Sequence, residues 1–184
     1  MKRLFTPILL LFVILLCSEK EYENPAVKNL MIVAGKTYEL SQAVIVENRV
    51  SKEYEGEPWY NVVFLSEYIE YETGNNWFTG AGQVMDFEIN TPEKDEVSNG
   101  VYLLNPNSND DDFEVWSAYY MTRFNSDSNE DDEGDFDLIA GKLEVNIDKN
   151  KGTIEFNGVD ENGMEVKGYY SGAIPKNLIY EFKD

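Results

Sequence analysis

Apolar and polar residues alternate with a period of two along much of the chain, whereas a helical period of 3.6 is almost absent. The clearest run lies between positions 84 and 90, and a second lies between positions 142 and 148. The residues expected to point inward in these runs are Met85, Phe87, Ile89, Leu143, Val145 and Ile147. Those expected to point outward are Asp86, Glu88, Glu144 and Asn146. This pattern predicts half-buried strands of an antiparallel sheet.

Turn residues separate these runs from further apolar segments. Hairpin turns are predicted at residues 148–152 and 160–163, because Asn and Gly there readily adopt the left-handed conformations that tight turns require. Segments rich in Val, Ile, Tyr, Phe and Trp predict further strands at residues 36–47, 59–71, 100–104, 113–124 and 178–182. We therefore expect an all-β fold, a single antiparallel meander closed as a barrel. A two-sheet sandwich is the second choice, since it also hides the sheet edges.

The beginning of the sequence has the layout of a secretion signal. Lys2 and Arg3 precede an apolar run that ends at Leu16, and the sequence becomes acidic at Glu19. The run is shorter than the about 20 apolar residues that a membrane-spanning helix needs, and Pro7 interrupts it. We expect residues 1–16 to be a lipoprotein signal peptide, residues 17–30 a polar tether, and residues 31–184 one β-domain.

The single cysteine, Cys17, stands at the end of the apolar run, so no internal disulfide can form. The sequence Ile14-Leu15-Leu16-Cys17-Ser18 resembles the lipobox of bacterial lipoproteins, although Leu16 stands where that motif has a small residue. The resemblance implies that Cys17 is acylated and anchors the chain to membrane lipid. The acidic segment after Cys17 is similar to the export signals of surface lipoproteins in Bacteroidota. The expected location is the outer membrane of the cell envelope, and the similarity of the acidic segment implies a domain that faces the surface.

The later strands carry a second resemblance. Residues 140–145, 152–156, 162–163 and 166–172, together with the earlier residues 35–40 and 99–102, resemble small envelope lipoproteins of Bacteroidota with a lipocalin-like β-barrel domain. The shared features are turn glycines and inward aromatic residues, so the resemblance implies a fold and a location but no activity. The Gly-x-Trp signature of true lipocalins is missing, and a transport role does not carry over.

Charge and composition exclude several function classes. The chain has 35 acidic and 15 basic residues and a formal charge of −20, which repels nucleic acid and anionic lipid surfaces. It contains no histidine, which removes the common general base and the usual partner of serine and cysteine nucleophiles. Paired carboxylates could still hydrolyse glycans, but the sequence selects no particular pair. We expect no catalytic residue and no enzyme activity.

An acidic loop offers a candidate metal site. Asn129, Asp131, Glu133 and Asp135 supply oxygen atoms at alternate positions, and such ligands suit Ca²⁺. Ala140 stands where an EF-hand has its last glutamate, and strands are expected on both sides. The alternative is a solvated loop that binds no metal. Apart from this calcium, no cofactor is expected.

Aromatic residues provide the candidate ligand-binding positions. Trp116 and Tyr120 are expected to share one face of their strand, and Tyr60, Phe64 and Tyr68 one face of another. Both strands have large apolar residues on each side. Either neighbouring elements cover both faces, or one face lines a ligand groove in which aromatic rings beside carboxylates hold a sugar.

The combined prediction is a non-catalytic, membrane-anchored lipoprotein that serves as a binding or interaction module of the envelope, with a glycan or an envelope protein as its ligand. The first alternative is a carrier that holds a small apolar ligand in an interior cavity. The second is a glycan-acting enzyme that uses a carboxylate pair, and the third is a subunit of a surface appendage.

Overall fold

The computed structural model describes residues 29–49, 59–72, 77–92, 96–104, 113–127, 135–175 and 178–181. Every regular element in these ranges is a strand, which confirms the all-β prediction. None of the described segments is a helix that could cross a bilayer. The strands are β1 (Leu30–Val33), β2 (Lys36–Glu39), β3 (Gln42–Arg49), β4 (Trp59–Leu65), β5 (Ile69–Glu72), β6 (Trp77–Asn90), β7 (Gly100–Leu104), β8 (Glu114–Asn125), β9 (Asp135–Asp148), β10 (Lys151–Asp160), β11 (Glu165–Ala173) and β12 (Leu178–Glu181).

The strands form one mixed sheet in the order β12-β3-β4-β6-β8-β7-β9-β10-β11-β1-β2, and β5 pairs with β6 outside this series. The prediction of a purely antiparallel meander is wrong at two places, because β12 lies parallel to β3 and β7 lies parallel to β8. Among the described residues, the hydrogen-bonded series ends at β12 and β2 and does not close into a ring.

The short strand β7 is inserted between two strands that would otherwise be neighbours. Strands β8 and β9 pair directly only where Tyr119, Tyr120 and Met121 face the beginning of β9. Farther along they separate, and β7 pairs with β9 on one side and, through Leu103 and Leu104, with β8 on the other. This insertion produces the parallel β7–β8 pair. The sequence pattern did not predict it, because hairpins were expected to join neighbouring strands, which would then run antiparallel.

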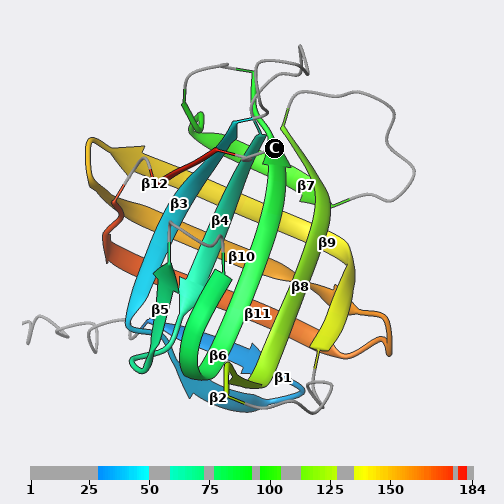
Figure 1. Ribbon diagram of the computed structural model, residues 1–184. Coiled ribbons are helices and arrows are strands. Elements are labelled where there is room, and N and C mark those ends of the chain that lie inside the picture. The colour runs from blue at the N-terminus through cyan, green and yellow to red at the C-terminus, as the bar shows by residue number, and fades with distance from the viewer. Residues whose placement is uncertain are drawn as a thin grey trace, which may run out of the picture.

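The sheet folds over into two layers around the main core. In Figure 1, β3, β4, β6 and β8 lie side by side in front, and β9, β10 and β11 cross behind them at a steep angle. The rings of Phe87 and Phe156 touch across the two layers, with centroids 4.9 Å apart. The largest side chains of the interior are fully buried: Tyr60, Tyr102, Tyr120, Phe64, Phe87 and Phe156.

A second apolar cluster covers part of the opposite, outer face of the front layer. Strand β5 and the first part of β6 fold across this face and bury Ile69 and Phe78 against valines and larger apolar residues of β3, β4, β6 and β8. Gly80 permits the close approach, because it has a positive φ of 103° and a Cβ atom there would collide with the carbonyl oxygen of Tyr68. Both faces of β4 and β8 are therefore covered over part of their length, which explains their two-sided apolar sequences.

The predicted alternation is confirmed on the inner face. All six residues expected to point inward are buried in the main core, and Glu144 and Asn146 are exposed. The two predicted hairpins are also present, joining β9 to β10 and β10 to β11. Asp86 points to the outer face as predicted, but neighbouring side chains cover it there and leave it only 7% exposed.

Candidate functional site

A row of polar side chains crosses the outer face of the front layer beside the second apolar cluster. The strand register fixes this face, since Asp86 of β6 lies opposite Val63 of β4 on one side and Tyr119 of β8 on the other. One step along, Asn61 of β4 lies opposite Glu88 of β6. We call the following residues the polar row: Asn48, Asn61, Asp86, Glu88 and Tyr119.

Hydrogen bonds link the row into a chain that ends on Asp86. The amide of Asn48 donates to Oδ1 of Asn61 over 2.6 Å, and the amide of Asn61 donates to Oδ1 of Asp86 over 2.8 Å. The hydroxyl of Tyr119 donates to Oδ2 of Asp86 over 3.3 Å. Both carboxylate oxygens of Asp86 therefore have a donor, as a buried carboxyl group requires.

Burial changes the acidity of this carboxyl group. The pKa of Asp86 is raised from 3.8 to about 7, chiefly because burial removes the carboxylate from water; the negative charge of Glu88 contributes to the rise, and the bonds from Asn61 and Tyr119 oppose it. The pKa of Glu88 is also raised, chiefly by burial, while the bond from Asn61 lowers it. The pKa of the Tyr119 hydroxyl is raised by burial and by the adjacent Asp86. Asp86 can accept and release a proton near neutral pH, a property that is common at functional sites.

Trp116 lies on the same outer face, beside Glu88. Ile89 pairs with Val115 and Glu88 pairs with Ser117, so Trp116 is an extra residue of β8, a β-bulge. Its side chain is 52% exposed. The prediction that Trp116 and Tyr120 share a face is wrong, because the extra residue shifts the alternation and sends the two side chains to opposite faces.

Tyr120 lies inside the main core and has a structural role. Its ring stacks on Phe136 with centroids 5.3 Å apart, and its hydroxyl donates to Oδ2 of Asp160 over 2.7 Å. The other oxygen of Asp160 accepts the backbone N–H groups of Asn162 and Met164 in the β10–β11 turn. Burial and Asp160 raise the pKa of the Tyr120 hydroxyl. The sequence marked the turn around Asp160 but gave no signal of its tyrosine partner.

The other three aromatic candidates do not form one surface. Tyr60 and Phe64 are buried in the main core, whereas Tyr68 is 74% exposed in the turn between β4 and β5. The expectation that Tyr68 continues their face is wrong, because β4 ends at Leu65 before the chain turns. Of the five predicted aromatic positions, Trp116 and Tyr68 are the exposed ones, and they lie on different elements.

Trp116 belongs to a group of exposed apolar side chains where β7, β8 and β9 meet. We call Val101, Leu103, Trp116 and Ile139 the apolar patch; their exposed fractions are 45%, 56%, 52% and 44%. Leu103 lies opposite Glu114, and Trp116 is two residues beyond Glu114 on the same strand. At this diagonal separation the Trp116 side chain can reach Leu103. Asp137 of β9 pairs with Tyr119 and lies on the outer face, and Ile139, two residues farther along β9, lies on the same face. Sequence reasoning singled out only Trp116, because nothing local shows that β7 lies beside it.

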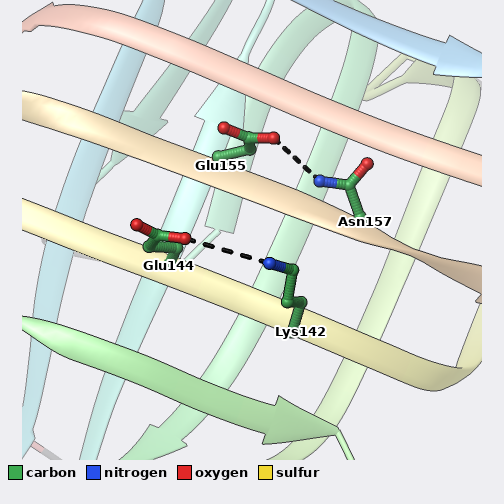
Figure 2. A network of polar contacts seen from close by, with 4 residues as sticks. All are labelled: Lys142, Glu144, Glu155 and Asn157. Carbon is green, nitrogen blue, oxygen red and sulfur yellow. Dashed lines mark hydrogen bonds and ion pairs between the residues drawn. The ribbon is translucent and has the colours of Figure 1, made fainter.

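Beyond β7, the outer surface continues onto the back layer, where Lys142 and Glu144 lie next to Leu103 and Val101. Figure 2 shows Lys142 and Glu144 of β9 beside Glu155 and Asn157 of β10, with an ion pair of 4.0 Å and an amide–carboxylate bond of 2.8 Å. A surface hollow of about 650 Å³ lies at the end of the same layer, lined by the β9–β10 turn and by Ser171 and Gly172 of β11. Such solvated, charged side chains are usual on an exposed sheet face.

The predicted anchor and most of the predicted calcium site lie outside the described residues. This applies to Cys17, Asn129, Asp131 and Glu133, whereas Asp135 is the exposed first residue of β9. Within the described segments, no group of three or more Cys, Asp or Glu side chains is arranged to hold a metal ion. The calcium hypothesis stays a prediction.

Comparison of this chain with protein-family models, with curated proteins and with solved structures finds no match.

Proposed function

We propose that this chain is a non-catalytic, membrane-anchored lipoprotein of the cell envelope whose β-domain binds a partner through the outer face around Trp116. The observation that carries the proposal is the half-exposed Trp116 at a β-bulge, with exposed Leu103 on the neighbouring strand. An exposed tryptophan loses little side-chain entropy on binding and buries a large apolar area, and such residues often dominate the binding energy of interfaces.

The packing of the interior supports a surface site over an internal one. Phe87 of the front layer and Phe156 of the back layer meet at the centre, and both are fully buried. Large aromatic side chains occupy the space that a small-ligand carrier would keep open. The alternative of an interior carrier therefore receives less support than the outer face does.

The proposal includes a closed, lipocalin-like barrel. The carbonyl of Pro175, just after β11, accepts the N–H of Ile45 in β3 over 3.3 Å, and the chain then runs into β12 beside β3. Strand β3 and the segment after β11, which lie near the two ends of the hydrogen-bonded series, are thereby brought next to each other. This proximity supports closure, which would remove exposed sheet edges.

The anchor completes the proposal. Acyl groups on Cys17 would hold the domain to the outer membrane, and the polar residues 17–30 would let it stand away from the lipid. A module held in this way meets partners in the envelope or outside the cell.

The test compares the wild-type chain with Trp116→Ala in binding to solubilised envelope components from the source cells. We expect the exchange to weaken binding by at least about tenfold, since alanine at a central aromatic contact typically costs 2 kcal/mol or more. Tyr68→Ala is the matched control, because Tyr68 is an exposed aromatic residue outside the apolar patch. Equal binding by the wild type and by Trp116→Ala would refute the proposal.

The alternative of a glycan-acting enzyme receives less support. Asp86 and Glu88 stand two residues apart on one face of β6 with raised pKa values, and Trp116 lies beside Glu88. However, Asp86 is only 7% exposed and both of its carboxyl oxygens already accept hydrogen bonds, so it cannot reach the leaving oxygen of a sugar as this reaction requires.

A further inference from the structure

We infer that the apolar patch binds a protein segment whose apolar side chains are flanked by lysine or arginine. The inference rests on the proposed function and deepens it, because it names the chemistry of the partner. It is carried by two features that occur together on the outer face: exposed apolar side chains and an acidic border that local basic residues do not balance.

The apolar part of the surface is aliphatic as well as aromatic. Val101 and Leu103 alternate with buried Tyr102 on β7, so both point to the outer face with about half of each side chain exposed. Trp116 and Ile139 extend the surface onto β8 and β9. Aliphatic groups gain little from the face of a sugar ring but bury well against leucine- or valine-like side chains of a protein.

Acidic residues border the patch on several sides. Exposed Glu144 pairs across the sheet with Val101, whereas Glu114, opposite Leu103 on β8, is only 8% exposed and does not reach the surface of the border. Glu88 lies opposite Ser117, next to Trp116, and Asp137 precedes Ile139 on the outer face of β9.

Among the residues that the structure describes, the basic side chain placed between these acids is Lys142, which lies opposite Leu103. Its ammonium group is 4.0 Å from the Glu144 carboxylate, so these two charges largely offset each other. Half-buried Glu88 and exposed Asp137 keep the border acidic. A basic residue that flanked an inserted apolar side chain would meet these carboxylates at the edge of the contact.

The charge of the whole chain favours the same partner. With 35 acidic against 15 basic residues, the chain repels nucleic acid and anionic lipid, and a second copy would bring the same acidic border against this one. A neutral glycan would gain no long-range attraction from the border. A basic protein segment is attracted over a Debye length and then buries its apolar side chains on the patch.

The test uses the full chain and defined probes. A fluorescently labelled peptide of leucine and tyrosine flanked by lysine and arginine is titrated with protein, next to a peptide of the same apolar core flanked by glutamate and a neutral oligosaccharide. We expect the basic peptide to bind, the acidic one not to bind, and added salt to weaken the complex. Trp116→Ala should weaken binding by at least about tenfold, whereas Tyr68→Ala should not.

A pair of charge reversals separates local from overall electrostatics. Glu144→Lys changes the border, and Glu70→Lys makes the same change of charge at an exposed position of β5 away from it. We expect Glu144→Lys to weaken binding several-fold more than Glu70→Lys. Equal effects of the two reversals, or binding that ignores Trp116→Ala, would overturn the inference, because the peptide would then be held by the overall charge alone.

Other outcomes separate this inference from the proposal on which it rests. Trp116-dependent binding of the oligosaccharide, or Trp116-dependent self-association, without binding of the basic peptide would overturn the basic partner and leave the surface as the binding site. Envelope binding that is unaffected by Trp116→Ala would refute the proposed function itself. Failure of the basic peptide to bind the wild type would also overturn the inference.

Discussion

Replacement of Asp86 by asparagine should change how the stability of the fold depends on pH. Burial raises the pKa of Asp86 from 3.8 to about 7 in the folded chain, so the folded state holds this proton more tightly than the unfolded state does. The resulting stabilisation is complete below about pH 4 and is lost as the pH rises towards 7. Each pH unit in this interval changes the free energy of unfolding by about 1.4 kcal/mol, which accumulates to about 4 kcal/mol.

Asparagine has nearly the same shape but no proton to lose in this range. It can accept one of the bonds from Asn61 and Tyr119, so the loss of the other should cost about 1 kcal/mol at every pH. We expect Asp86→Asn to be less stable than the wild type by about 0.5 kcal/mol at pH 4 and more stable by about 3 kcal/mol at pH 8. The two curves should cross at about pH 4.5.

Urea unfolding of both proteins at intervals between pH 4 and 8, followed by circular dichroism, measures this difference. Asp137→Asn is the control for the loss of one negative charge. Asp137 is an exposed residue of β9 that pairs with Tyr119, the same residue that pairs with Asp86 on its other side. A difference between wild type and Asp86→Asn that stays constant over the whole interval would refute the reasoning. It would mean that water reaches this carboxyl group and that burial does not control its proton.

Three further predictions concern the anchor and the packing. Cys17→Ser should move the protein from the membrane fraction to the soluble fraction, and its persistence with membranes on immunoblots of fractionated cells would contradict lipid anchoring. Phe156→Ala should lower the free energy of unfolding by about 3–5 kcal/mol in urea titrations, because it removes the ring that meets Phe87 between the layers. Gly80→Ala should destabilise the chain by more than 1 kcal/mol and increase hydrogen exchange in β5 first, since the new Cβ would collide with the carbonyl of Tyr68.

Much of the fold could be predicted because its signals are local. The β10–β11 turn depends on Gly163 with a positive φ of 75° and on Asp160, whose carboxylate accepts N–H groups within its own turn. Alternation in β9 likewise depends on neighbours in the sequence, so Leu143 and Glu144 were assigned to the correct faces. These elements form for reasons that a stretch of about ten residues already contains.

The candidate site could be predicted only in part. Trp116 was singled out as a large aromatic residue, but its bulge depends on a partner strand about thirty positions earlier in the sequence. Val101 and Leu103 read as ordinary strand residues until β7 lies beside β8 with this face open. Asp86 reads as a solvated acid because its strand alternates cleanly, and its donors come from two other strands.

The sequence by itself determined that the chain is all-β, where most strands run, which side chains face the main core and that the molecule is strongly acidic. These properties follow from the pleat of each strand and from turn chemistry, which act over a few residues. Only the tertiary structure decided the parallel pairs, the bulge that turns Trp116 outward, the cover that β5 places over the outer face and the burial of Asp86. The physical reason is that burial is a property of contacts between distant segments, and a single extra residue in one strand reverses the faces of all that follow.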